Sequence, residues 1–202
     1  MTLCNFPDGY LRFILTQRVP ALVPPDPTRR QAAVLLPLFR NATDYHLVFT
    51  KRTETLTHHK GQISFPGGSF ESADGDLLTT ALRESYEEVG IQPEHVSVLG
   101  RLDDLPTFST TFTISPFVGL IPYPYPFRPN PIEVAIVFDA PLAVLADPTV
   151  QRRYIRARDD GATIEDVEFH VNGHVIWGAT ARILHHFLAI IGGKLRRPRR
   201  QD

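Results

Sequence analysis

A group of acidic residues near the end of one predicted helix constrains this chain more than any other feature. Apolar residues recur at helical spacing from Leu77 to Val89, which predicts a helix with one buried stripe, and Gly90 is predicted to end it. Glu87 and Glu88 follow Glu84 by three and four positions, so the three side chains project from one side of the last turns. We call these three residues the glutamate cluster.

The glutamate cluster is unfavourable for a helix that binds nothing. Each like-charged neighbour pair costs roughly a few tenths of a kcal/mol, and the negative end of the helix dipole lies beside the cluster. Arg83 offsets only part of this repulsion. The cluster is therefore either a solvated acidic face or a site where carboxylate oxygens, together with substrate phosphate, hold a hard divalent cation such as Mg²⁺.

The segment from Gly68 to Ile91 resembles the Nudix box. That pattern is a glycine, five residues, a glutamate, seven residues, Arg-Glu, an apolar residue, any residue, Glu-Glu, any residue, a glycine and an apolar residue. The chain departs from this pattern at three points. Asp74 replaces the first glutamate, and eight residues instead of seven separate it from Arg83. Ser85 replaces the apolar residue. Asp74 is therefore either a metal ligand or a helix cap that accepts backbone N–H bonds.

The residues that precede the box resemble the extra motif of coenzyme A pyrophosphatases within the Nudix family. The chain agrees with that motif at Thr50, Arg52, Gly61, Phe65, Pro66, Gly67 and Gly68. It departs where Val48 and Phe49 replace two leucines and Thr53 replaces a serine. Thr57 stands in place of a second arginine, which could have bound a phosphate through two hydrogen bonds. The other side chains here that could supply positive charge are Arg52, His58, His59 and Lys60.

This resemblance implies a fold of the α/β class, a Nudix-like α/β/α sandwich with a mixed central β-sheet. It also implies a Nudix-type pyrophosphohydrolase that uses Mg²⁺ or Mn²⁺ to hydrolyse the diphosphate of coenzyme A or acyl-coenzyme A. The products would be 3′,5′-ADP and (acyl-)4′-phosphopantetheine. Two alternatives stay open: a Nudix hydrolase of another nucleoside diphosphate derivative, such as ADP-ribose or NADH, and a non-catalytic Nudix module that binds a nucleotide. The intact glutamate cluster argues against the second alternative.

The resemblance also assigns roles to individual residues. The residues that would carry the reaction are Glu84, Glu87, Glu88 and Arg83. The glutamate cluster would hold the metal ions, while Arg83 would orient the carboxylates by ion pairing. The residues that would bind the substrate are Arg52, Lys60, Gly67 and Gly68. The two glycines would let main-chain groups approach the diphosphate. The candidates for the general base are a box glutamate, Glu133, His58 and His59.

The composition agrees with a single soluble enzyme domain. The chain has 202 residues, of which 43% are hydrophobic, so it can bury a full core. Its net charge of −1 argues against a general nucleic-acid surface, and no segment approaches the roughly twenty apolar residues of a membrane span. The single cysteine, Cys4, excludes an internal disulfide. We therefore expect a cytoplasmic protein that binds a small nucleoside diphosphate substrate and neither nucleic acid nor membrane, with a homodimer as one option.

Three regions are expected along the chain. Residues 1–29 are predicted to form a helix after Asp8 and a proline-rich connector, both packing on the core. Residues 30–192 form the expected Nudix hydrolase domain. Residues 193–202 are predicted to be a basic, flexible tail.

Residue patterns predict the elements of the core. Strands are expected at residues 31–39, 45–51, 61–65, 96–102, 112–121 and 132–138. A short helix is expected at 141–146. Asn172-Gly173 predicts a hairpin between strands at 167–171 and 175–177, because both residues tolerate positive φ.

A final helix is predicted over residues 179–191, with His185 and His186 at its surface rather than as metal ligands. Trp177, which precedes this helix, is expected in the core.

Residues 122–131 alternate proline with aromatic residues and are expected to form a loop. Its Tyr123, Tyr125 and Phe127 either stack on an adenine ring or pack on the rim of the fold.

Overall fold

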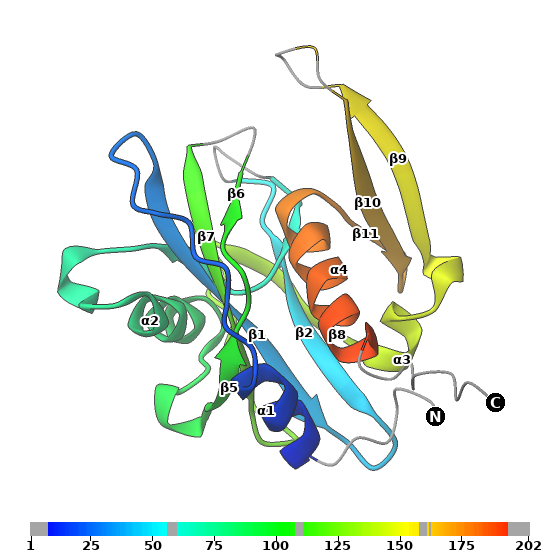
Figure 1. The fold of residues 1–202 in the computed structure, drawn as a ribbon. Helices are drawn as coiled ribbons and strands as arrows, with labels where there is room; N and C mark the ends of the chain where they lie inside the picture. Colours follow the sequence, from blue (N-terminus) through cyan, green and yellow to red (C-terminus); the bar gives the residue numbers. More distant parts are fainter. Residues whose placement is uncertain (1–7, 56–59, 108–110, 158–160, 162, 194–202) are drawn as a thin grey trace.

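The computed structural model describes the chain except for residues 1–7, 56–59, 108–110, 158–160, 162 and 194–202 (Figure 1). Some residues of the sequence-based predictions therefore lie outside the described residues: Cys4, Thr57, His58, His59 and all of the basic tail after Gly193. Within the described ranges, no helix has the length and apolar content that crossing a membrane requires.

The centre of the fold is a mixed β-sheet. Among the described residues its strands are β1 (Arg30–Arg40), β2 (Tyr45–Arg52), β3 (Ile63–Ser64), β4 (Gly67–Ser69), β5 (Ser97–Arg101), β6 (Leu105–Pro106), β7 (Phe112–Leu120) and β8 (Val134–Pro141). The main strand order is β3-β2-β1-β7-β5, with β4 paired to β1, β6 to β7 and β8 to β2. Strands β1 and β7 run parallel, and the other pairs run antiparallel. The predicted strands of this sheet are present, with ends that differ by up to three residues, whereas β4 and β6 were not predicted.

Strand β1 lies at the centre because its sequence is apolar on both faces. Leu36 and Leu38 belong to one buried cluster, whereas Ala33 and Leu35 belong to another on the opposite face. A strand that is covered on both sides needs such a nearly continuous apolar run. Helices must therefore cover both faces of the sheet.

The helices meet this requirement. They are α1 (Asp8–Thr16), α2 (Leu77–Val89), α3 (Leu142–Leu145) and α4 (Gly178–Gly193). Helix α2 packs on β1, β4 and β7, and its buried residues join the cluster that contains Leu35. Helices α1 and α4 supply residues to the cluster on the other face, which contains Leu36 (Figure 1). The predicted α/β/α sandwich with a mixed central sheet is confirmed.

Helix α2 has the predicted bounds, but its buried face differs from the prediction. Asp76 caps its first turn by accepting a 2.7 Å hydrogen bond from the Thr79 N–H, and Gly90 ends it with φ 73°. Leu78 and Leu82 of the predicted apolar stripe are only half-buried. The fully buried residues of the helix are Thr80, Ala81, Ser85, Glu88 and Val89. One member of the glutamate cluster therefore lies inside the fold.

The N-terminal segment contacts the same domain. Leu11, Ile14 and Leu15 of α1 are buried in the core. The Arg18 guanidinium pairs with the Asp103 carboxylate at 2.5 Å, and this carboxylate also accepts a hydrogen bond from a backbone N–H of the connector.

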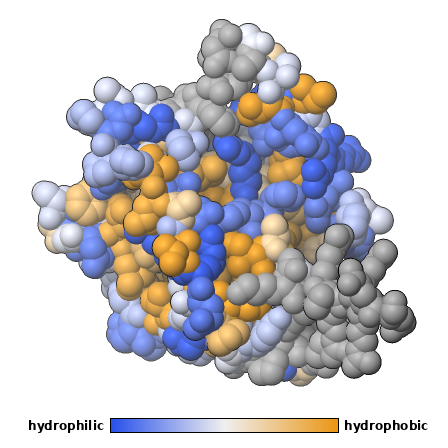
Figure 2. Space-filling view, viewed as in Figure 1, coloured by the Kyte–Doolittle hydropathy of each residue, from blue (hydrophilic) through white to orange (hydrophobic). Residues whose placement is uncertain are grey.

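A second, three-stranded antiparallel sheet lies beside α4. Its order is β11-β10-β9, formed by β9 (Gln151–Ala157), β10 (Thr163–Val171) and β11 (His174–Ile176). The hairpin at Asn172-Gly173 is confirmed, because both residues have positive φ and Val171 pairs with His174. Strand β9 was not predicted. Figure 2 shows a largely hydrophilic surface over β9 and β10, which agrees with the three arginines of β9 and explains its weak apolar signal.

The prediction that Trp177 packs in the core is wrong. Trp177 is 45% exposed, because it precedes α4 at the surface. His185 and His186 lie on the outer face of α4 and are partly exposed. His186 lies 3.1 Å from the Asp103 carboxylate, and His185 lies 3.4 Å from the Arg153 guanidinium.

Candidate functional site

Glu88 is the most unusual residue of the site. It is 3% exposed, and its carboxylate has two long hydrogen bonds to described residues. The Gly67 N–H donates to Oε2 and the Arg52 guanidinium donates to Oε1, both at 3.3 Å. Burial raises the pKa of Glu88 to about 8, against the opposing effects of Arg52 and Gly67. A buried carboxylate with so few partners is well suited to accept a cation or a proton.

Arg83 is the centre of an ion-pair network along the outer side of α2. Its guanidinium nitrogens lie 2.7 Å from Asp74, 2.9 Å from Glu84 and 3.2 Å from Glu87. It also donates to the Ser69 carbonyl oxygen at 3.1 Å. Arg83 therefore ties α2 to the loop that precedes it and fixes the orientation of these carboxylates.

Asp74 does not cap α2, whose first turn is capped by Asp76. The Asp74 side chain is almost fully buried and accepts hydrogen bonds from Arg83, Thr80 and the Glu71 N–H. The bond from Arg83 holds the pKa of Asp74 far below its usual value. Asp74 therefore caps the short 3-10 helix Ser72–Asp74 rather than α2, and it also anchors Arg83.

The glycine pair before the box allows Glu84 to approach the main chain. A Cβ atom on Gly68 would overlap the Glu84 carboxylate, and one on Gly67 would overlap β1 at the Ala33 carbonyl oxygen. Gly67 also has φ 154°, which other residues rarely adopt. Burial raises the pKa of Glu84, while the neighbouring Arg83 opposes this shift. The carboxylate of Glu84 therefore lies directly against the backbone at Gly68.

The carboxylates fit a divalent cation in chemistry, although they are held by arginines in this structure. Nowhere in the described part of the chain do three His, Cys, Asp or Glu side chains converge as a ready metal site. The charge of Glu133 nevertheless raises the pKa of both Glu84 and Glu88, and the charge of Glu84 raises that of Glu88, so the three carboxylates lie close together. Their oxygen atoms, with the backbone at Gly68, are ligands that Mg²⁺ and Mn²⁺ prefer. The 53% exposed Glu87 side chain lies at the margin of this group.

A cavity of about 400 Å³ opens beside the glycine pair. Its lining includes Arg52 and Gly68 from the central sheet, Arg156 from β9, Arg182 from α4 and Trp177. A volume of this size is typical of small-ligand sites. The cavity therefore joins the acidic site to the second sheet.

A model of the NUDIX domain family matches residues 28–170 of the chain. The chain belongs to the Nudix family. Two relatives, each named uncharacterized Nudix hydrolase NudL, support this assignment. The relative from Photorhabdus laumondii is 38% identical over 168 residues, which are 81% of this chain and 88% of the relative. The relative from Pectobacterium atrosepticum is 38% identical over 184 residues, which are 88% of this chain and 90% of the relative.

Two solved structures share the fold. A MutT/nudix family protein from Enterococcus faecalis superposes with a TM-score of 0.54 at 13% identity, over 93% of this chain and 70% of that one. A protein from Deinococcus radiodurans gives a TM-score of 0.50 at 15% identity, over 81% and 88% of the two chains. The chain is thus a Nudix-type pyrophosphohydrolase, and Nudix hydrolases generally use divalent metal ions.

The structure brings most of the predicted Nudix site residues together. Arg52, Gly67 and Glu88 are in direct contact, and Gly68 touches Glu84. Lys60, by contrast, is exposed and does not line the described part of the cavity. Of the base candidates, Glu133 lies just before β8, near Glu84 and Glu88.

The aromatic residues of the loop at 122–131 pack on the rim of the Nudix fold. Tyr123 stacks on Phe39 with ring centroids 4.9 Å apart. The Tyr125 hydroxyl accepts a hydrogen bond from the Gln92 N–H, and its ring contacts Phe127. None of the three aromatic residues lines the described cavity. The aromatic residues found there are Phe65, Phe112 and Trp177.

Sequence reasoning missed the arginines of the second sheet and α4. Arg156 lies on the unpredicted strand β9, and Arg182 follows the Ile-Trp-Gly run by four positions. Only the dense arginine content of residues 152–156 could have indicated a basic wall.

Proposed function

We propose that this Nudix enzyme hydrolyses the diphosphate of coenzyme A or acyl-coenzyme A with Mg²⁺ or Mn²⁺. The products are 3′,5′-ADP and (acyl-)4′-phosphopantetheine. One observation carries the proposal: Arg52 and Gly67, both from the coenzyme A-type motif, contact the same carboxylate of Glu88. The motif and the box therefore form a single site.

The glutamate cluster and Arg83 have different roles in this proposal. Glu84 and Glu88 are the principal ligands of the metal, and Glu87 is a further ligand from the margin of the site. When bound, the ion neutralises the diphosphate and lowers the pKa of a water molecule. Arg83 positions the carboxylates through its ion pairs with Glu84 and Glu87.

The glycine pair and Arg52 serve the substrate. Gly67 and Gly68 bring main-chain groups close to the diphosphate, and any side chain at Gly68 would occupy the space of Glu84. Arg52 offers positive charge at the boundary between the glutamate cluster and the cavity. Glu133 and Glu84 are the described candidates for the base that takes the proton from water, because both lie beside the buried Glu88.

The rival within the same class is a hydrolase of ADP-ribose or a dinucleotide such as NADH, and Thr57 favours it because the second motif arginine is missing. A substrate panel separates the two. Coenzyme A, ADP-ribose and NADH are assayed with Mg²⁺ and with Mn²⁺, and the products are identified by mass. We expect the highest kcat/KM for coenzyme A and release of 3′,5′-ADP. If ADP-ribose is the best substrate, the coenzyme A proposal fails while the family assignment stands.

A further inference from the structure

The cavity beside the acidic site has a basic lining. Arg52, Arg156 and Arg182 come from three elements far apart in the sequence, and all three line it. The described residues of the lining include no aspartate or glutamate. An anionic ligand is therefore the chemistry that this wall fits.

Arg156 and Arg182 share one buried carboxylate, that of Asp166. Asp166 is 3% exposed, and its Oδ2 atom lies 3.5 Å from the Arg156 Nε atom. Neither of these two atoms has a hydrogen-bond partner in the described structure. Asp166 also attracts the Arg182 guanidinium, whose pKa is lowered by burial. Arg156 and Arg182 therefore both lie near this buried carboxylate and line the same cavity.

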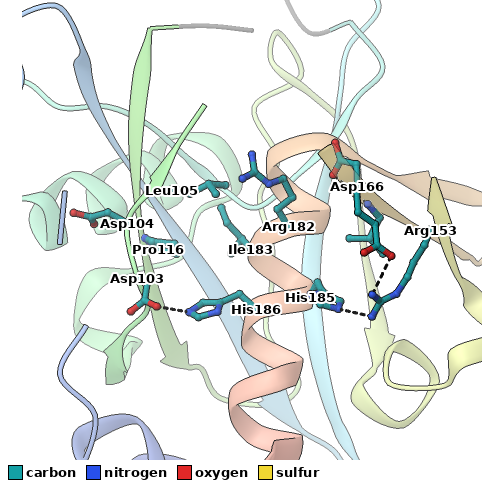
Figure 3. Close-up of a pocket in the computed structure, with 12 residues that line it drawn as sticks. Asp103, Asp104, Leu105, Pro116, Arg153, Asp166, Arg182, Ile183, His185 and His186 are labelled. Atoms are coloured by element: carbon teal, nitrogen blue, oxygen red, sulfur yellow. Dashed lines mark hydrogen bonds and ion pairs between the residues drawn. The ribbon is translucent and has the colours of Figure 1, made fainter. Parts of the chain in front are cut away.

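The neighbouring cavity of about 390 Å³, shown in Figure 3, differs in charge. It shares Arg182 and Asp166 with the basic wall, but Asp103, Asp104 and Glu165 also line it. Figure 3 shows the Asp103–His186 pair on one side of α4 and the Arg153–His185 pair on the other. These carboxylates would repel an anion in that cavity. An anion that binds Arg182 is therefore expected in the cavity beside Gly68.

Arg52 serves a different part of the ligand. Its guanidinium lies 3.3 Å from Glu88, so its charge belongs with the acidic site where the diphosphate is cleaved. A ligand that reaches from there to Arg156 and Arg182 needs a second anionic group separate from the diphosphate. In coenzyme A that group is the 3′-phosphate of the adenosine.

We propose that Arg156 and Arg182 form a subsite for the 3′-phosphate monoester on the nucleotide half of the substrate. The proposal rests on the proposed function, and it makes these two arginines the determinants of preference for coenzyme A over 3′-dephospho-coenzyme A. Guanidinium groups suit this role, because each can give two parallel hydrogen bonds to a phosphate. Trp177 lines the same cavity and offers an aromatic surface for the purine.

The test compares kcat/KM for coenzyme A and 3′-dephospho-coenzyme A in the wild type, Arg156→Gln and Arg182→Gln. Loss of one charge-assisted contact should lower the ratio of the two values by about tenfold, through KM for coenzyme A rather than through kcat. Arg182→Lys keeps the charge and should restore part of the ratio. Arg152→Gln is the matched control, because Arg152 is exposed on the same strand and lines none of the described cavities. It should keep the wild-type ratio.

A direct binding measurement separates this proposal from the proposed function. Calorimetry with 3′,5′-ADP and 5′-AMP should show tighter binding of 3′,5′-ADP to the wild type, and this difference should be lost in Arg182→Gln. If coenzyme A is cleaved but the ratio is unchanged in both glutamine variants, the subsite is wrong and the proposed function stands. If coenzyme A is not cleaved, the proposed function fails, and the calorimetric difference alone decides the subsite. Equal binding of the two nucleotides by the wild type would overturn it.

Discussion

The acidic site on α2 and the basic wall at β9 and α4 differ in how their charges are balanced. Around α2, Arg83 lies within 2.7–3.2 Å of three carboxylates, and Glu88 is the exception with contacts of 3.3 Å. In the basic wall, the Asp166 carboxylate lies 3.5 Å from Arg156 and also attracts Arg182. The first region gathers carboxylates around the buried Glu88, whereas the second gathers arginines beside a cavity.

This difference matches two separate tasks. A site with buried, mutually repelling carboxylates gains most from a metal ion, which supplies the chemistry. A wall lined by arginines gains most from an anionic part of the substrate, which supplies affinity. Changes in the acidic site should therefore act on kcat, and changes in the basic wall on KM.

The largest effect is expected for Glu88→Gln. This substitution keeps the size of the side chain but removes its charge, so turnover should fall at least about a hundredfold. Steady-state kinetics at saturating metal measures the effect, with Glu94→Gln as the control because Glu94 is exposed just beyond α2. Near wild-type turnover in Glu88→Gln would remove this residue from the reaction.

The next effect concerns the Arg83 network. Arg83→Gln leaves the buried Asp74 without its main partner, so the free energy of unfolding should fall by about 3 kcal/mol. Arg153→Gln removes an ion pair whose side chains are 59% and 62% exposed, and it should cost less than about 1 kcal/mol. Urea unfolding of both variants measures the difference. Equal losses would mean that Arg83 does not anchor the loop before α2.

A smaller effect should appear in the pH dependence of metal-free stability. In the folded protein the pKa of Glu88 is raised to about 8. Between its ordinary pKa and pH 8, Glu88 is therefore protonated in the folded state and ionised in the unfolded state. Stability from this residue therefore falls as the pH rises through that window and levels off above it. Thermal melts in chelator should show that Glu88→Gln gains stability over the wild type from about pH 5 to about pH 8. A difference that is constant with pH would show that Glu88 is ionised throughout.

The contrast between the two regions also explains what the sequence could predict. The bounds of α2 follow from local chemistry, a capping residue at Asp76 and a positive-φ glycine at Gly90, so they can be predicted from neighbouring residues. The turn at Asn172-Gly173 is local in the same way. The acidic site was predictable because its residues lie on one helix and in one short motif.

The basic wall could not be predicted, because tertiary packing assembles it. Arg156 and Arg182 meet only where β9, β10 and α4 come together, and no local pattern relates their positions. The burial of Glu88 could not be predicted for the same reason, because it depends on which face of α2 packs on the sheet. The polar Ser85 lies on that buried face, where its hydroxyl donates to the Ala81 carbonyl oxygen. The prediction that Trp177 lies in the core is wrong because the exposure of this side chain depends on the shape of the cavity that it lines.

The most direct test of this account is the effect of Mg²⁺ or Mn²⁺ on the melting temperature of the wild type and of the double variant Glu84→Gln with Glu88→Gln. An ion at a hundred times its dissociation constant stabilises the folded state by roughly 2.7 kcal/mol, so the wild-type melting temperature should rise measurably. The double variant should be at least as stable as the wild type in chelator and should show no metal-induced rise. An equal rise in both proteins, or a double variant much less stable in chelator, would contradict the assignment of these buried carboxylates as the metal site.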